Sequence, residues 1–232
     1  MVSIKLMVVY TKANGEMVKR MVKASVHGLM VMYMKVSGKM MNITKASTYA
    51  NGDVYEGDWN DDNFHCQGKY TYANGDVYEG FYEDDYMHGQ GKFTYANGDV
   101  YEGGYKNGKK HGQGKFTYAN GDVYEGRWQY KVREGYGRMT YANGCVFDGL
   151  WKDNVRSSQG TQTWPDGSIY EGDWEEELRH GIGKQKWSDG RVYEGDWIDD
   201  MLHGYGVFSY PDGTTHKGEF LNNMFTIKVN VM

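Results

Sequence analysis

The sequence predicts an all-β protein in which tandem 23-residue β-hairpins form one elongated, twisted, antiparallel meander sheet with an aromatic and glycine groove. The first observation is the period: a tyrosine or its substitute recurs every 23 residues, with glycine two residues later and an aromatic residue four residues later. The second is the composition. It includes 33 Gly, 21 Tyr and 7 Trp but only 2 Pro, which favours rings laid over bare backbone rather than a thick aliphatic core.

Residues 1–47 are an atypical N-terminal segment. They hold eight Lys/Arg and one Glu, a net charge of +7, so residues 48–232 carry −12 of the total of −5. The 23-residue spacing persists there in pairs such as Met7/Met30 and Tyr10/Tyr33. We interpret the segment as repeats translated in a shifted frame, because synonymous codons from Val9 onward can spell hidden Tyr-x-Gly-x-Trp motifs. The alternative is a genuine basic tail that is disordered or weakly structured.

Residues 48–221 contain eight copies of the repeat, each interpreted as two strands. In the first strand of the first copy, residues alternate with period two, so Tyr55, Gly57 and Trp59 share one face of the sheet. The second strand, residues 68–72, places Gly68 and Tyr70 on that same face. Short connections between strands force neighbours in sequence to pair antiparallel, because a parallel partner requires a long crossover.

Two kinds of connection alternate along the repeats. Asn74-Gly75 and its equivalents predict a two-residue hairpin turn with positive φ angles. The other connection, residues 83–88 in one copy, is expected to be longer and polar and to let the sheet bend. After the last copy, residues 222–232 are expected to form a capping or edge strand that could pair with another chain. Its alternating apolar residues are Phe225, Ile227, Val229 and Val231.

Tyr55-Glu56-Gly57-Asp58-Trp59 and the corresponding residues 170–174 resemble the membrane occupation and recognition nexus (MORN) repeat. The resemblance covers residues 48–221. Phe147 and His216 depart from it by replacing the tyrosine, and Cys66 and Ser158 by replacing a glycine. It implies an extended, groove-forming sheet that scaffolds protein assemblies at cytoskeletal or membrane-associated structures and sometimes dimerises. It also implies a phospholipid role, and some relatives attach the repeats to a lipid kinase or a methyltransferase.

The candidate interaction site is the aromatic face. Its rings are expected to stack between hairpins and hold the sheet together, and the same groove could receive a helix or another sheet. The groove residues are Tyr55, Trp59, Tyr78, Tyr82, Tyr101, Tyr105, Tyr124, Trp128, Trp151, Tyr170, Trp174, Tyr193 and Trp197.

Catalytic and metal chemistry are not expected. One repeat position holds five histidines, His65, His88, His111, His180 and His203. Adjacent hairpins place these about 9.6 Å apart, too far to share a zinc ion with its bonds of about 2 Å. The acidic connections lack the ligand pattern of an EF-hand loop, so solvated charge is expected there. Cys66 and Cys145 lie at opposite ends of different hairpins, so no disulfide between them is expected. We predict no cofactor and no enzymatic activity.

The predicted function is therefore a scaffold or adaptor that mediates protein–protein interaction, including self-association. The alternatives are a peripheral membrane adaptor for phosphoinositides, or the targeting module of a lipid kinase or methyltransferase whose catalytic domain is absent. The acidic repeats disfavour nucleic acid and anionic lipid as partners. The predicted location is the cytoplasm, at cytoskeletal or membrane-associated structures, since no apolar run of about 20 residues and no signal peptide is evident.

Overall fold

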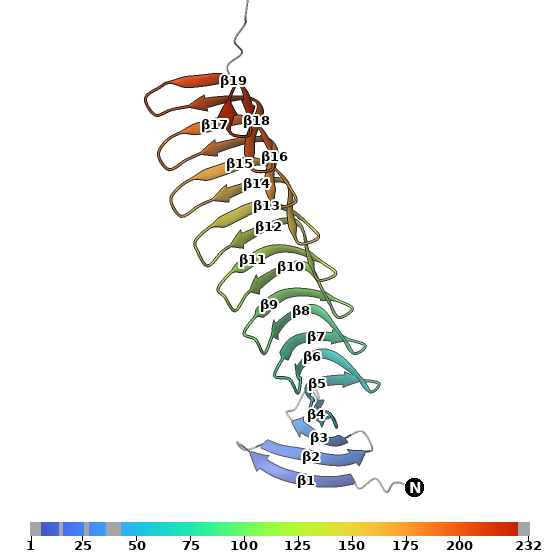
Figure 1. The fold of residues 1–232 in the computed structure, drawn as a ribbon. Helices are drawn as coiled ribbons and strands as arrows, with labels where there is room; N and C mark the ends of the chain where they lie inside the picture. Colours follow the sequence, from blue (N-terminus) through green and yellow to red (C-terminus); the bar gives the residue numbers. More distant parts are fainter. Residues whose placement is uncertain (1–5, 14–15, 26–27, 36–42, 227–232) are drawn as a thin grey trace, which may run out of the picture. The chain divides into compact units, whose positions relative to one another are not determined.

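The computed structural model describes residues 6–13, 16–25, 28–35 and 43–226, with side chains from residue 46 to residue 226. Every regular element in these ranges is a β-strand. The chain divides into two units, Met1–Ala119 and Asn120–Met232. In both units hairpins follow one another in sequence order (Figure 1).

The described residues of the first unit, which spans residues 1–119, form ten strands. Each pairs antiparallel with the next one along the chain, so the unit is a meander. The strands are β1 (Leu6–Ala13), β2 (Glu16–Ser25), β3 (Gly28–Lys35), β4 (Ile43–Thr48), β5 (Val54–Asn60), β6 (Asn63–Thr71), β7 (Val77–Glu83), β8 (Tyr86–Thr94), β9 (Val100–Lys106) and β10 (Lys109–Thr117).

The second unit, residues 120–232, has ten more strands within its described part, up to residue 226, with the same sequential antiparallel pairing. They are β11 (Val123–Gln129), β12 (Val132–Thr140), β13 (Val146–Lys152), β14 (Val155–Thr163), β15 (Ile169–Glu175), β16 (Leu178–Lys186), β17 (Val192–Ile198), β18 (Met201–Ser209), β19 (Thr215–Leu221) and β20 (Met224–Phe225). The predicted all-β meander of tandem hairpins is thus confirmed in each unit.

The atypical N-terminal segment contributes strands to the first unit. Strand β4 spans the predicted boundary at residues 47/48 and pairs with β5 through residues 45–48. Strands β1, β2 and β3 pair antiparallel with one another. The shifted-frame hypothesis concerns the transcript and stays a prediction.

The two kinds of connection are the reverse of the expectation. The tight turns are Asp84-Asp85 and its equivalents, where φ is 47° and 68° and the flanking strands run into the turn from both sides. The Asn74-Gly75 sequence instead lies inside a five-residue loop between β6 and β7, residues 72–76, in which only Gly75, at φ 95°, has positive φ. The prediction missed this because Asp and Asn, like Gly, tolerate the left-handed region and can form the tight turn themselves.

The sheet also departs from regular pairing inside the strands, a feature that the repeat pattern did not indicate. In the first repeat hairpin Gly57 pairs with Gly68, but Trp59 pairs with Phe64, so the longer strand carries extra residues there. The same shift follows the equivalent glycine in every later hairpin of 23-residue spacing up to β17–β18. A bulge of this kind bends the strand and increases its twist. The irregularity therefore lies beside the glycines and not in a long polar loop.

Side-chain hydrogen bonds join most of the five-residue loops to the loop of the next hairpin. Asp76 Oδ1 accepts a bond from the Ala96 N–H, 20 residues later, at 2.7 Å. Asp53, Asp99 and Asp122 accept the same bond from the N–H groups of Ala73, Ala119 and Ala142. The Ser168 hydroxyl oxygen accepts one from the Ser188 N–H. Two repeats have Cys145 or Arg191 at the position of the acceptor.

The chain's two prolines complete this pattern. Pro165 and Pro211 stand 20 residues after Cys145 and Arg191, where the other repeats have a donor N–H. Because proline has no N–H, the repeats without this acceptor also have no donor to satisfy.

Candidate binding surfaces

The predicted groove residues form the core of the hairpins. In β7, Tyr78, Gly80 and Tyr82 are buried, while Glu79 and Phe81 on the opposite face are exposed. The six tyrosines that open the repeats have no exposed surface, and all but one of the other predicted groove residues are buried. The exception is Trp59, which is half-buried. A ring without exposed surface cannot touch a partner, so the six tyrosines serve the packing of the hairpins. Partner binding at the other predicted positions stays a prediction.

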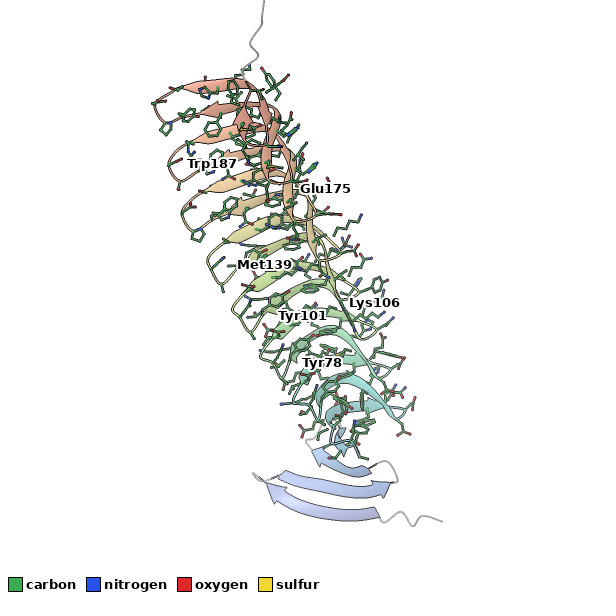
Figure 2. All side chains as sticks on the ribbon, viewed as in Figure 1. Tyr78, Tyr101, Lys106, Met139, Glu175 and Trp187 are labelled. Carbon is green, nitrogen blue, oxygen red and sulfur yellow. The ribbon has the colours of Figure 1, made fainter. Side chains whose placement is uncertain are left out.

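The glycines explain this burial. A methyl group added at Gly80 would lie 2.5 Å from the Tyr78 hydroxyl and 2.6 Å from the Cα of Gly91 on the next strand. The tyrosine ring therefore lies flat across two glycines on paired strands, on the side where side chains would otherwise stand. Its hydroxyl donates a hydrogen bond to the carbonyl of Phe81 at 3.0 Å. Figure 2 shows Tyr78 and Tyr101 among the strands and Lys106 at the rim beside a tight turn.

Edge-on contacts link the aromatic rings of successive repeats. The Phe147 ring meets Trp151 of its own strand edge-on at 5.3 Å and Trp174 of the next hairpin at 5.3 Å. The Trp174 indole N–H also donates to the Gly160 carbonyl at 3.1 Å. Such ring pairs contribute about 0.5–1.5 kcal/mol each beyond the area that they bury. The predicted packing of rings between hairpins is therefore observed.

Burial raises the pKa of Tyr193 to about 12, with a smaller contribution from Asp196. Burial likewise raises the pKa of Tyr95 to about 12, with smaller contributions from Asp76 and Asp99. These hydroxyls stay protonated at neutral pH, so they can donate hydrogen bonds and cannot serve as general bases.

The face opposite the tyrosines carries an open groove in each unit. In the first unit a groove of about 940 Å³ runs over the glycine backbone between two rows of polar side chains. One row alternates in charge across the strands, with Lys69 Nζ 3.0 Å from Glu79 and Lys92 Nζ 2.8 Å from Glu102. The other row holds Gln67, Gln90 and Gln113 with Asp58 and Phe81.

The groove of the second unit, about 650 Å³, keeps a row of charged side chains, but its other row differs from that of the first unit. Where the first unit has glutamines, it has Tyr136 and Ile182, which are 64% and 67% exposed. Leu150, 39% exposed, pairs directly with Tyr136 across the strands. Sequence reasoning missed this surface, although apolar residues at positions that are otherwise polar in the repeat were a visible signal. We call it the apolar outer groove.

The histidine position lies beside the tight turns and is partly paired with their carboxylates. His88 Nδ1 lies 3.1 Å from Glu83, and His180 lies 3.4 Å from both Glu175 and Asp199. Among the described residues no group of three or more His, Cys, Asp or Glu could hold a metal ion. Both cysteines are free, and Cys66 adopts a φ of 53° at a position where other repeats have glycine.

The predicted edge lies at the C-terminal end of the second unit. Only Phe225 of its four predicted residues can be placed, since Ile227, Val229 and Val231 lie outside the described residues. The Phe225 ring packs on His216 at 5.1 Å and on Phe220 at 5.2 Å. Strand β20 pairs with β19 only at residues 220–221, so residues 215–218 of β19 have one side without a described strand partner.

The fold and these surfaces define an all-β repeat protein with open sheet faces. Seven consecutive matches to the MORN repeat family cover residues 55–77, 78–100, 101–123, 124–146, 147–169, 170–190 and 193–215. The chain therefore belongs to the MORN repeat family. MORN repeats occur in protein-interaction and membrane-binding modules and are generally non-catalytic. No curated protein matches the chain. In the described part, no helix is long and apolar enough to cross a membrane.

Proposed function

We propose that this chain is a non-enzymatic scaffold that binds a partner protein along the apolar outer groove of its second unit. The observation that carries the proposal is the row of exposed apolar side chains, Tyr136, Leu150 and Ile182, on the solvent face of a sheet whose core lies on the other face. Exposed apolar groups that line a groove between polar walls are typical of protein interaction sites.

The charges of the groove favour a partner of defined character. Its lining includes the carboxylates of Asp148, Glu171 and Glu194 against the single ammonium of Lys184. A partner segment with apolar side chains on one face and Lys or Arg beside them would match both features. Opposite charges steer such an encounter, and the apolar contacts then slow dissociation.

The proposal is tested by photo-crosslinking. A benzophenone amino acid at Gln159, which lines the groove, is placed in the full chain and in a Tyr136→Ser/Ile182→Ser variant. The matched control is Tyr86→Ser/Tyr130→Ser, which removes two side chains of similar exposure, 59% and 62%, at the tight turns. We expect a defined crosslinked protein with the parent and with the control, and its loss from the groove variant.

The alternative of phosphoinositide binding is measured beside it, by sedimentation with vesicles that contain phosphatidylinositol 4,5-bisphosphate. If the groove variant keeps its crosslinks, the groove is not the binding surface. If the parent captures no protein but sediments with the vesicles, the scaffold proposal is wrong and the membrane adaptor replaces it.

Self-association is the second part of the proposal, supported by the side of β19 that has no strand partner among the described residues at 215–218. A strand edge with free backbone groups can pair with a second copy. Light scattering of the full chain should show a dimer that Lys217→Pro dissociates, because proline removes a donor N–H. A monomeric parent would exclude this contact.

A further inference from the structure

On the buried-tyrosine face, a second column of aromatic rings stands directly after the longer strands, one per repeat, at the first position of each five-residue loop. We call this column the outer ladder. In the second unit it consists of Tyr141, Trp164, Trp187 and Tyr210, and in the first unit of Tyr49, Tyr72, Tyr95 and Tyr118. Figure 2 shows Trp187 on the side of these loops, opposite Glu175 beside a tight turn.

In the first unit the spaces between ladder rings are filled. Phe93 stands between Tyr72 and Tyr95, with ring centroids 5.8 Å and 4.4 Å away. Phe116 meets Tyr95 and Tyr118 in the same way, at 5.9 Å and 4.4 Å. A ligand therefore finds no space between neighbouring ladder rings here.

Two repeats of the second unit lack this filling ring. Gln162 and Gln185 stand at the position of Phe93, and their side chains lie buried beneath the ladder. A cleft of about 400 Å³ opens between Tyr141 and Trp164, and another of about 200 Å³ between Trp164 and Trp187. The Trp164 side chain lines both clefts and separates them.

Two arginine–carboxylate pairs form the floor of the clefts, so the charges of the floor balance. The Arg156 guanidinium lies over the Trp174 ring at 4.5 Å, donates to Gln162 at 3.1 Å and pairs with Glu177 at 2.7 Å. Arg179 repeats this arrangement one hairpin later, over Trp197 and with Gln185 and Asp200. Because both guanidiniums already have carboxylate partners, the clefts are not anion sites.

The spacing of the two clefts matches one kind of peptide. Equivalent positions in successive hairpins are two strand spacings apart, about 9.6 Å. A polyproline II helix rises about 3.1 Å per residue with three residues per turn, so prolines three residues apart are separated by about 9.3 Å. Grooves lined by aromatic rings accept such segments, whose stiffness lowers the entropy cost of binding.

We propose that the outer ladder of the second unit binds a proline-rich segment in the polyproline II conformation. Two prolines spaced Pro-x-x-Pro enter the clefts on either side of Trp164. The indole N–H groups of Trp164 and Trp187, two residues that line the clefts, are the donors for the carbonyls of the segment. This site lies on the opposite face from the apolar outer groove and is independent of it.

Charge adds a second requirement on the ligand. The lining residues of the two clefts carry the carboxylates of Asp166, Glu177 and Asp200 against the guanidiniums of Arg156 and Arg179. The net charge of this lining is −1, so a Lys or Arg flanking the prolines is favoured over an acidic residue.

The test uses the full chain and a labelled peptide, Arg-Ala-Pro-Ala-Ala-Pro-Ala-Ala-Pro, in fluorescence anisotropy. Comparison peptides place the prolines four residues apart or replace them with glycine. The filled variant is Gln162→Phe/Gln185→Phe, which reproduces the packing of Phe93 and Phe116. Its control is Lys186→Phe, on the exposed face of β16 directly after the buried Gln185.

We expect saturable binding by the parent and the control and at least a tenfold weaker affinity for the filled variant and for both comparison peptides. Indole N–H signals of Trp164 and Trp187 should shift on titration of the parent with the peptide, while that of the buried Trp128 should not. This second measurement requires no variant to fold. Absence of saturable binding, equal binding of the glycine peptide, or shifts confined to other residues would overturn the proposal.

Discussion

Removing the Asp76 carboxylate tests how neighbouring hairpins are joined. Its Oδ1 accepts the Ala96 N–H at 2.7 Å across two loops, and Asp76→Ala leaves that donor to water. A hydrogen bond to a charged group is worth about 1.5–3 kcal/mol. Since this bond is exposed, we expect a value near or below the lower end, about 1–1.5 kcal/mol.

Proline supplies the second arm of a double-mutant cycle. Ala96→Pro deletes the donor, and the backbone accepts proline at this position, because Pro165 and Pro211 occupy its equivalents. In the Ala96→Pro background, Asp76→Ala has no such bond to remove. The coupling energy between the two substitutions should therefore equal the bond, about 1–1.5 kcal/mol.

Hydrogen exchange of the Tyr95 and Gly98 amides reports on this loop, since both make backbone bonds within it at 2.9 Å. Asp76→Ala should speed their exchange about five- to tenfold in the parent, because 1.4 kcal/mol corresponds to a factor of ten. In the proline background it should have little effect. Equal acceleration in both backgrounds would refute the assignment of the bond.

An inverse control exists in the second unit. Arg191→Asp introduces an acceptor, but Pro211 offers no N–H, so it should not slow exchange in that loop. The double substitution Arg191→Asp/Pro211→Ala supplies both acceptor and donor, so it should slow exchange in that loop. If Arg191→Asp alone slowed amide exchange in the loop, the charge of the carboxylate, and not the hydrogen bond, would join the loops.

Three further changes test the packing of the rings. Phe147→Tyr should raise the free energy of unfolding by about 1 kcal/mol in urea titration, because its hydroxyl would reach a carbonyl as that of Tyr170 does at 2.9 Å; a loss would show that the site has no room for the hydroxyl. Gly80→Ala should lower the free energy of unfolding by about 2–3 kcal/mol in the same assay, since its methyl group meets the Tyr78 hydroxyl and the backbone of Gly91; a change below about 0.5 kcal/mol would contradict the close contact. The raised pKa of Tyr193, about 12, means that the folded state holds its proton longer than the unfolded state. Its contribution to stability should be complete below about pH 10 and lost as the pH rises towards 12. Absorbance at 295 nm and circular dichroism should then change together in the parent, and Tyr193→Phe should reduce the alkaline loss; early ionisation of a folded chain would contradict it.

Some of the candidate surfaces had signals in the sequence that required the register to be known. Tyr136 and Ile182 occupy positions that hold glutamine in other repeats, and Gln162 and Gln185 occupy positions that hold phenylalanine. Each exchange of polar and apolar residues marks a departure from the common hairpin. A departure becomes a surface only when the face on which it lies is known, and alternation along a strand does not say which face the sheet closes over.

The sequence by itself determined the 23-residue period, the antiparallel order of the strands and the sharing of one face by Tyr55, Gly57 and Trp59. These follow from local rules: short connections, period-two alternation and the small size of glycine. Only the tertiary structure decided which connection is tight, where pairing shifts beside the glycines, and that the tyrosine rings lie flat on the backbone and leave the opposite face open. The physical reason is that ring orientation and strand bulges depend on contacts between hairpins, which the residues of a single repeat do not specify.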